Sequence, residues 1–545
     1  MKKHKGKILV LVLAVLLVSV MSCENPFLKK MLVEEEKGNT VSQIPKHTIT
    51  FGVGSGLGAL KAEVDGNEIT TGDSVEQGKS VVFTAEPAEG YVLEQWTNAG
   101  LAITEAGTDK TYTRTVTANA DIKVKFQAPF VEGGASLILS PDKLDIKVKA
   151  VTSDGSAVAV EGCTETELTS GTETVLSAKG RRVILKGKII ELDCDSNQLT
   201  ALNVQGLTAL QTLPCHNNQL TALNVQDLSA LQTLICGNNQ LTELNVQGLT
   251  ALQGLGCDNN QLTALNVQGL TALQGLGCYG NQLTALNVQG LTALQGLGCW
   301  GNQLTALNVQ GLTALQGLSC GGNQLTALNV QGLTALKELW CVDNQLTELN
   351  VQGCTALCYL ICHDNQLTTL DVQGLTALRW LSCHGNQLTA LNVQGLTALK
   401  ELGCGGNQLT ELNVQGLTAL CYLICPDNQL TTLDVQGLTA LRWLSCGGNQ
   451  LTALNVQGLP ALKDLYCYGN RLNADAFKKL FDDLPARQDS DDAKCILYTE
   501  QTGVTEGNHT DFTAPQDLKD AFDNAKNNKK WKMYKRDGSW PGVEI

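Results

Sequence analysis

A repeat of 21 residues dominates this chain of 545 residues and limits what it can fold into. Between residues 189 and 470, fourteen cysteines recur in register from Cys194 to Cys467, and an asparagine follows each of them three residues later. Every unit also carries leucine at several fixed positions. A single unit cannot bury these leucines, whereas stacked units share one continuous core. The repeat therefore predicts a solenoid with strands about 4.8 Å apart.

Within each unit, the pattern L-x-x-L-x-C-x-x-N-x-L resembles the leucine-rich repeat, and the L-T-x-L-N-V that follows nests a similar motif. The unit is similar to the nested bacterial class of 21 residues, the IRREKO type. This resemblance implies an α/β-type solenoid, mostly β, in the form of a horseshoe of about 14 repeats at 189–470. It carries no information about catalysis, because one fold hosts many functions.

The asparagine and cysteine positions have structural explanations. We expect each asparagine to pair backbone groups of neighbouring turns, because buried polar groups need partners. Buried cysteine behaves as a small apolar residue. Side chains in parallel register point the wrong way for unstrained disulfides, and the ladder lacks the spacing of a metal site. The pairing of the remaining cysteines stays open: Cys163, Cys354, Cys358, Cys421 and Cys495.

The N-terminus reads as a targeting segment. Four lysines precede an apolar run that is too short to span a bilayer comfortably, which predicts a signal peptide at 1–22. The run ends in Val20-Met21-Ser22-Cys23, which resembles a bacterial lipobox and implies that Cys23 is lipidated. The polar residues 23–45 fit a flexible tether.

Three smaller parts flank this organisation. Residues 46–128 alternate apolar and polar side chains, and the segment from Phe83 to Trp96 resembles the divergent internalin-B-type repeat, which implies a small all-β spacer module. We expect Tyr91 and Trp96 in its core. Residues 134–188 predict a β-rich N-terminal cap, and 471–545 a small C-terminal α/β cap with a helix starting at Asn473.

The repeats differ from one another mainly in five columns around the L-x-x-L-x-C strand: two positions between the leucines, one before the cysteine and two after it. Strand side chains alternate between faces, so the position between leucine and cysteine points away from the core, onto the concave face. A block of 63 residues starting at Lys337 recurs at Lys400 and concentrates aromatic and charged residues.

Exposed Trp, Tyr and Arg are the usual anchors of protein interfaces. The later repeats therefore predict a binding strip, although drift on solvent-exposed positions after repeat duplication would also produce such variation. The predicted strip comprises Trp340, Tyr359, Trp380, Tyr422, Trp443, Tyr466, Glu338, Arg379, Glu401 and Arg442.

No catalytic or cofactor motif is visible, so we expect neither an enzyme nor a bound cofactor. His363 and His384 occupy the same position in adjacent units, but the sequence indicates no third ligand beside them, so we expect surface residues and no metal site. A net charge of −14 disfavours nucleic acid as a partner, because phosphate binding relies on clustered Lys and Arg.

Together these features favour an exported lipoprotein of the cell envelope, at the outer membrane or cell surface, that contacts the membrane through its lipid anchor alone. We expect it to bind a protein ligand of host cells or matrix through the concave face, since bacterial families of this architecture are associated with adhesion. Two alternatives stay open: a carbohydrate-binding surface protein that uses the same aromatic rings, and a periplasm-facing structural repeat protein.

Overall fold

The structure is a computed structural model that describes residues 44–539 and 541–545. The predicted signal peptide, Cys23 and nearly all of the tether fall outside these residues. The described chain divides into two compact units. Most of the first nine strands belong to one unit, and the other contains the repeats and their caps. No helix in the described ranges has the length and apolar character needed to cross a membrane.

The first unit is an all-β module with two antiparallel sheets, in the strand orders β4-β1-β9-β6-β7 and β3-β2-β5-β8. Trp96 is fully buried, and its indole Nε1 donates a hydrogen bond to the Asp109 carbonyl at 2.8 Å, which explains how a polar ring atom is accommodated in the core. The elements are β1 (Lys46–Ser55), β2 (Gly58–Val64), β3 (Asn67–Ile69), β4 (Asp73–Glu76), β5 (Ser80–Pro87), β6 (Val92–Asn98), β7 (Leu101–Ala102), η1 (Thr104–Ala106), β8 (Thr111–Thr115) and β9 (Ala120–Gln127).

The second unit begins with a β-rich segment that covers the first turn of the repeats. Strand β11 pairs antiparallel with β16, the strand of the first repeat, with Lys149 opposite Asp193. This pairing protects an edge that would otherwise leave backbone groups unpaired. The strands are β10 (Gly134–Ile138), β11 (Asp145–Thr152), β12 (Val158–Glu161), β13 (Glu167–Leu168), β14 (Glu173–Ser177), β15 (Arg182–Lys186), β16 (Ile189–Asp193) and β17 (Ala201–Asn203).

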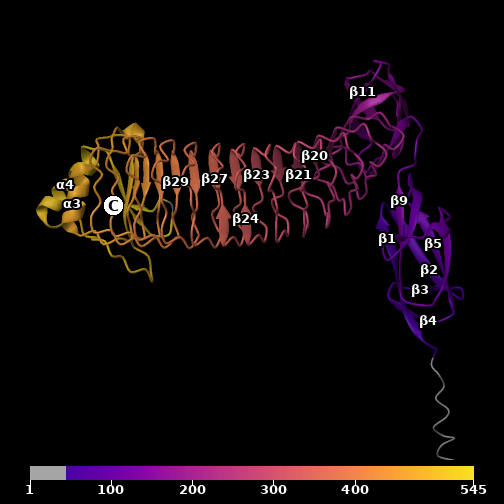
Figure 1. Cartoon of the computed structure of the whole chain (residues 1–545), viewed down its shortest axis with the longest axis horizontal. Coiled ribbons are helices and arrows are strands. Elements are labelled where there is room, and N and C mark those ends of the chain that lie inside the picture. Colours follow the sequence, from indigo (N-terminus) through magenta and orange to yellow (C-terminus); the bar gives the residue numbers. More distant parts are fainter. Residues whose placement is uncertain (1–43, 540) are drawn as a thin grey trace, which may run out of the picture. The chain divides into compact units, whose positions relative to one another are not determined.

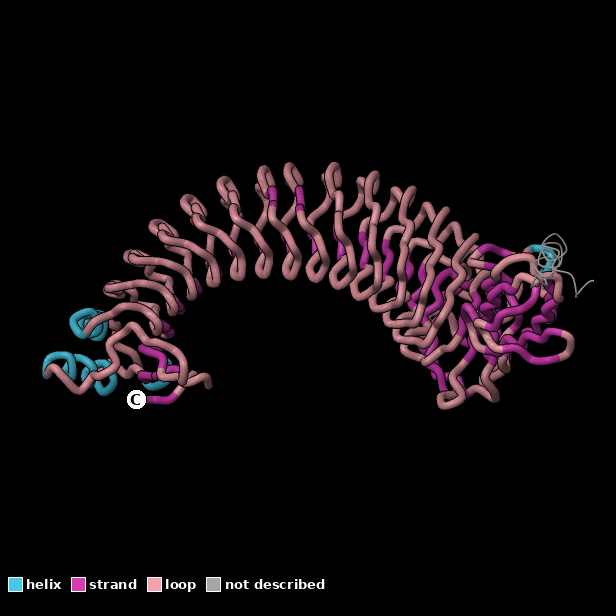
Figure 2. The backbone as a smooth tube through the Cα atoms, turned by 90° about the horizontal axis from the view of Figure 1, so that it is seen from below, coloured by secondary structure: helices cyan, strands magenta, loops and turns pink. Residues whose placement is uncertain are grey.

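The repeats stack as a mostly β solenoid, and their short strands form one parallel sheet in which each turn pairs with the next without a change of register. Successive turns lie side by side along a curve (Figures 1 and 2). The strands are β18 (Thr212–Pro214), β19 (Thr233–Ile235), β20 (Gly254–Gly256), β21 (Gly275–Gly277), β22 (Gly296–Gly298), β23 (Gly317–Ser319), β25 (Glu338–Trp340), β27 (Tyr359–Ile361), β28 (Trp380–Ser382), β29 (Glu401–Gly403), β30 (Tyr422–Ile424), β31 (Trp443–Ser445) and β32 (Asp464–Tyr466).

The second half of each repeat, the nested L-T-x-L-N-V motif, is mostly not a strand, although its alternating sequence resembles one. It forms a strand only at β17, β24 (Ala327–Asn329) and β26 (Glu348–Asn350) within the described chain, and the remaining turns run through it as irregular backbone. Its leucines and valines are still buried, as Leu265 and Val267 show. Packing of the apolar side chains therefore holds this half in place without a continuous second sheet.

The asparagine ladder has the predicted structural role. The Asn302 amide donates to the carbonyls of Cys278 and Cys299, both at 3.0 Å, and its Oδ1 accepts from the Leu283 backbone N–H at 3.0 Å. One side chain thereby serves two turns, and the same three bonds recur along the stack, for example at Asn407. This network pairs backbone groups that the tight turns leave without strand partners.

The C-terminal segment closes the other end. Strand β33 extends the parallel sheet beside β32, and Asn508 continues the asparagine ladder by donating to the Cys467 carbonyl at 2.8 Å. The predicted helix and its N-cap are confirmed, because the Asn473 side chain accepts from the Ala476 N–H. The remaining elements are α3 (Ala474–Asp483), η2 (Asp489–Asp491), β33 (Lys494–Thr499), α4 (Gln516–Asn527), β34 (Lys532–Arg536) and β35 (Val543–Glu544).

Candidate functional site

The strand of each turn has two outward positions on the open face of the parallel sheet, although some turns carry glycine there. In β25, Leu339 is buried in the core, while Glu338 and Trp340 on either side of it point the other way. The parallel register aligns these positions from turn to turn into two columns, which we call the first and second strand columns. The first column runs through Glu338, Tyr359, Trp380, Glu401, Tyr422, Trp443 and Asp464, and the second through Trp340, Ile361, Ser382, Gly403, Ile424, Ser445 and Tyr466.

The structure brings most of the predicted strip onto this face. The Tyr359 and Trp380 rings are 6.3 Å apart, and Trp380 is the more exposed of the two. Glu338 is exposed and Glu401 half-buried in the first column. Arg379 and Arg442 are exposed, one residue before the strands of their turns. Neighbouring turns of a parallel sheet are about 4.8 Å apart, so these side chains are close enough to contact one partner together.

Tyr466 does not fit the predicted binding role. It is 4 % exposed and packs with Ile496 and Tyr534 of the C-terminal cap, and the Trp443 ring lies edge-on to it at 5.0 Å. The cap therefore covers the last part of the strip. The accessible part extends from Glu338 to Trp443, which is half-buried.

An open pocket of about 570 Å³ lies between the turns that carry Trp380 and Tyr422. The turn between them carries Gly403, Gly405 and Gly406, so it has no side chains at three outward positions. The turns before and after this glycine turn carry the large side chains of Trp380 and Tyr422, which border the pocket on both sides. The pocket is lined by Trp380, Ser382, His384, Gly385, Glu401, Leu402, Gly403, Gly405, Gly406, Tyr422, Ile424, Pro426 and Asp427.

Sequence reasoning missed several of these lining residues. Ile424 is 40 % exposed, which is unusual for a large aliphatic side chain. The residues before and after it in the chain are fully buried in the core. Its position directly before Cys425 is an outward-facing position of the repeat, so the sequence of the repeats already indicated that this isoleucine is exposed. The sequence did not indicate that Gly403 and Pro426 line a pocket, because this depends on the side chains of the adjacent turns.

The second position after each cysteine has a backbone role that sequence variation alone does not reveal. This residue adopts a left-handed conformation in every turn, with φ of 53° at Asp364, 53° at Asp427 and 60° at Gly406. Gly, Asn and Asp tolerate this conformation better than other residues. The choice of residue in this column is therefore restricted by the turn, and its variation is weak support for ligand binding.

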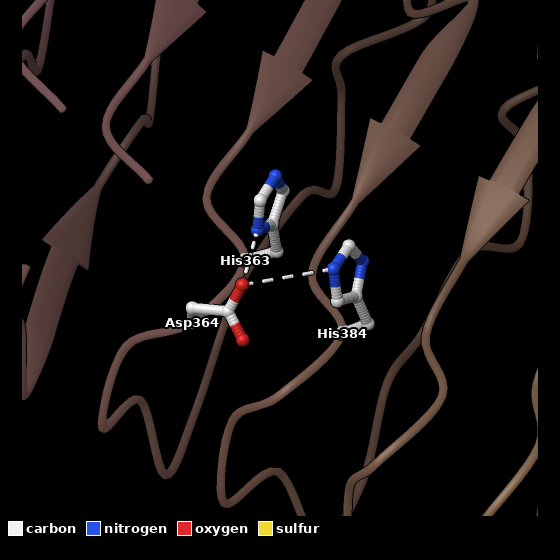
Figure 3. A group of neighbouring side chains, drawn as sticks. All are labelled: His363, Asp364 and His384. Atoms are coloured by element: carbon white, nitrogen blue, oxygen red, sulfur yellow. Dashed lines mark hydrogen bonds and ion pairs between the residues drawn. The ribbon is translucent and has the colours of Figure 1, made fainter. Parts of the chain in front are cut away.

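A second group of polar side chains comes from two adjacent turns (Figure 3), and one of them, His384, also lines the pocket. His363 Nδ1 is 2.7 Å from Asp364 Oδ2, and His384 Nε2 of the next turn is 3.8 Å from the same oxygen. The two imidazole rings stack with centroids 4.1 Å apart. Burial, and then the neighbouring His363, lower the pKa of His384. Asp364 therefore supplies the third donor that we did not expect beside the two histidines.

The cysteine ladder is buried and reduced. All the cysteines in the described chain are free, including the five whose pairing the sequence left open. Burial raises the pKa of ladder thiols, to about 12 at Cys320 and Cys383, so they remain protonated at neutral pH. Cys354 replaces a buried leucine, and its Sγ donates to the Val330 carbonyl. Cys358 and Cys421 are half-exposed.

Comparisons with known proteins agree with this architecture. The divergent InlB B-repeat domain family matches residues 59–129. The functional domain of InlJ from Listeria monocytogenes, which includes a cysteine ladder, is 31 % identical over 64 % of this chain and 73 % of that chain, with a TM-score of 0.53. A leucine-rich-repeat protein of Leptospira interrogans is 30 % identical over 54 % of this chain and 81 % of that chain, with a TM-score of 0.50. No curated protein matches the sequence.

The InlJ domain and this chain both include a cysteine ladder, and the match covers more than two thirds of that domain. The matched Leptospira protein has the same repeat fold. The chain therefore belongs to the internalin-like leucine-rich-repeat proteins.

Proposed function

We propose that this protein binds a protein ligand of host cells or matrix, and that the pocket between Trp380 and Tyr422 is the centre of the contact. The pocket carries the proposal: it is an open hollow of about 570 Å³ bordered by two aromatic residues and the exposed Ile424. Aromatic side chains in pockets near the middle of an interface supply most of its binding energy.

The surroundings of the pocket match the composition of protein interfaces. Trp380, Tyr422, Ile424 and Pro426 provide an apolar centre, and Glu401 and Asp427 add charge at its border. Arg379 lies exposed next to Trp380. An apolar core with a polar rim is the usual anatomy of such contacts. The ligand is therefore expected to insert one bulky apolar side chain and to offer a basic group towards Glu401 or Asp427.

The cellular setting of this proposal rests on the N-terminal sequence and on the internalin-like family. A basic segment, an apolar run and Cys23 support export and lipid anchoring. The InlB B-repeat domain at 59–129 supports a spacer between the anchor and the repeats. Leucine-rich-repeat surfaces are suited to extended protein contacts, because stacked repeats present a continuous concave face.

The test is binding of the purified chain to epithelial cells and to immobilised matrix proteins. A Trp380→Ala/Tyr422→Ala variant removes the borders of the pocket, and a Tyr279→Ala/Trp300→Ala variant removes two aromatic residues that lie outside it and are more exposed, at 44 % and 45 % against 38 % for Trp380. We expect the first variant to bind at least about 30-fold more weakly, as the loss of one anchor costs about 2 kcal/mol. We expect the second variant to bind like the parent.

Circular dichroism establishes that both variants keep the repeat fold, and free glycans are added as competitors in a parallel series. Equal binding by the pocket variant and the parent would contradict the proposal. Loss of binding only in the Tyr279→Ala/Trp300→Ala variant would move the site to the earlier repeats. Competition by a simple glycan would replace the protein ligand with a carbohydrate.

A further inference from the structure

Three metal-binding side chains converge on the open face beside the pocket. One ligand atom from each of His363, Asp364 and His384 lies within 4.8 Å of the other two (Figure 3). We infer that these residues form a binding site for a divalent transition-metal ion of the zinc type. This inference is independent of the proposed ligand, because it concerns the metal alone.

The separations suit tetrahedral coordination. Zinc bonds to nitrogen and carboxylate oxygen are about 2.0–2.2 Å long, which places neighbouring ligand atoms about 3.3 Å apart. The separations from Asp364 Oδ2 to the two ring nitrogens, 2.7 Å and 3.8 Å, lie on either side of that value. The His363 and His384 side chains are 25 % and 44 % exposed, so neither ring is enclosed in the core and both have room for small adjustments around an ion.

The backbone holds the three residues in fixed positions. The Asp364 N–H donates to the His384 carbonyl at 3.0 Å, so the two turns are joined at the site itself. Asp364 takes the left-handed conformation of its column, and a Cβ at residue 385 would lie only 2.4 Å from Asp364 Oδ1. Gly385 therefore leaves room for the carboxylate between the turns.

A buried serine orients one of the rings. Ser382 Oγ is 3.0 Å from His384 Nδ1, and the serine is only 7 % exposed. When Nδ1–H donates to this oxygen, Nε2 carries the lone pair and faces Asp364 (Figure 3). Metal-binding histidines are commonly held by such a hydrogen bond through the other ring nitrogen.

The repeated block provides an internal comparison. Sixty-three residues later, the positions equivalent to His363, Asp364, Ser382 and His384 hold Pro426, Asp427, Ser445 and Gly447. The fold of the repeat therefore does not require histidine at these positions. Two histidines with one carboxylate form the nitrogen and oxygen donor set that zinc accepts, and three protein ligands leave one position for water.

The test is a calorimetric titration of the full chain with Zn²⁺ alone. Cys358→Ser and Cys421→Ser are introduced into every protein, because these half-exposed thiols could also bind zinc. We expect one zinc ion per chain and a rise in melting temperature on zinc addition. A His363→Gln/His384→Gln variant should bind at least about 100-fold more weakly, since even loss of an outer-shell partner costs about 10- to 100-fold.

The matched controls are Asp427→Asn, the equivalent carboxylate of the repeated block, and His216→Gln, a histidine paired with a single carboxylate, Asp195. Both should bind zinc like the parent, whereas Asp364→Asn should weaken binding. Failure of the parent to bind zinc would overturn the inference, as would unchanged binding by the double histidine variant or loss of binding in either control. None of these outcomes bears on the ligand proposed for the pocket.

Discussion

At the scale of residues, the repeat is held together by side chains that serve two turns at once. Asn302 pairs carbonyls of its own turn and of the preceding one, and is 7 % exposed. The side chain of Asn308 in the same unit is exposed, and its Oδ1 accepts from the Gln310 N–H within its own turn. The two asparagines therefore differ greatly in what their removal leaves unpaired.

We expect Asn302→Ala to lower the free energy of unfolding by about 3 kcal/mol, because it leaves the Leu283 N–H buried without a partner and removes one of the two hydrogen bonds that each of two buried cysteine carbonyls accepts. Asn308→Ala should cost less than about 1 kcal/mol, since water replaces its exposed contact. Urea unfolding followed by circular dichroism measures both changes. Equal destabilisation by the two substitutions would contradict the role assigned to the ladder.

The cysteines should react according to burial. Under native conditions, we expect an alkylating reagent to modify Cys358 and Cys421 and to leave the ladder thiols unmodified among the described cysteines. Burial protects the ladder sulfurs and also keeps them protonated, as the raised pKa of Cys320 shows. Mass spectrometry of digested protein identifies the labelled sites. Rapid labelling of Cys320 or Cys383 would contradict the packing described for the stack.

Asp258 should make stability depend on pH. Burial raises the pKa of its carboxyl from 3.8 to about 6, so the folded chain binds this proton more tightly than the unfolded chain. The resulting stabilisation is complete below about pH 4 and is lost as the pH rises to about 6. Asp258→Asn keeps an oxygen for the Tyr279 N–H, which donates to Oδ1 at 3.1 Å.

We expect Asp258→Asn to raise the free energy of unfolding by about 1 kcal/mol at pH 7, after allowance for the partial exposure of the carboxyl, and to change little at pH 4. Urea midpoints of parent and variant at the two pH values measure the difference. A variant no more stable than the parent at pH 7 would show that burial of the charged Asp258 carboxylate does not lower the free energy of unfolding.

At the level of elements, the sequence sufficed to predict the strand of each turn and its outward face. It did not suffice to predict which other segments cover that face. The spacing of Leu339 and Cys341 sufficed to place Trp340 on the outward face. The burial of Tyr466 depends on Ile496 and Tyr534, which follow a helix and further loops, and no spacing within the repeat indicates that contact.

The pocket and the histidine group were hidden for a related reason. The pocket arises where a turn of glycines lies between turns with large side chains, so it is a property of three neighbours rather than of any one. Asp364 could be recognised as a partner of His384 only once the left-handed turn at residue 364 had fixed its direction. Periodicity predicts which residues share a column, but side-chain contact also depends on turn conformation.

At the scale of the whole molecule, a solenoid depends on its caps more than on any one internal repeat. The C-terminal cap covers the last turn with a cluster that includes Phe477, Phe481 and Phe512. Each internal turn, in contrast, has identical framework neighbours on both sides. The loss of terminal and of internal segments should therefore have opposite consequences.

We expect removal of 471–545 to give insoluble protein, because it exposes the apolar end of the stack around Leu465 and Cys467. Excision of 337–399 removes one 63-residue block and rejoins the chain in register, so this shorter protein should stay soluble and folded. Solubility and circular dichroism compare the two. A soluble, folded protein without 471–545 would show that the segment is not needed as a cap.

If the ligand enters the pocket, a side chain that fills the pocket should block binding. A Cβ at Gly403 would lie 3.6 Å from Ser382 Oγ, an ordinary contact, and the same column already carries isoleucine at 361, two turns before Gly403, and at 424, in the next turn. Gly403→Ile should therefore fold normally and occupy the hollow. Gly298→Ile is the matched control, because it adds the same side chain to the same column outside the pocket, where a Cβ would lie 3.9 Å from its nearest neighbour.

The measurement is the affinity of parent, Gly403→Ile and Gly298→Ile for epithelial cells and matrix proteins. We expect affinity to fall about tenfold or more in Gly403→Ile, equivalent to about 1.4 kcal/mol, and to stay unchanged in Gly298→Ile. Undiminished binding by a folded Gly403→Ile protein would contradict the proposed role of the pocket, because a ligand that enters the pocket cannot share that space with the new side chain.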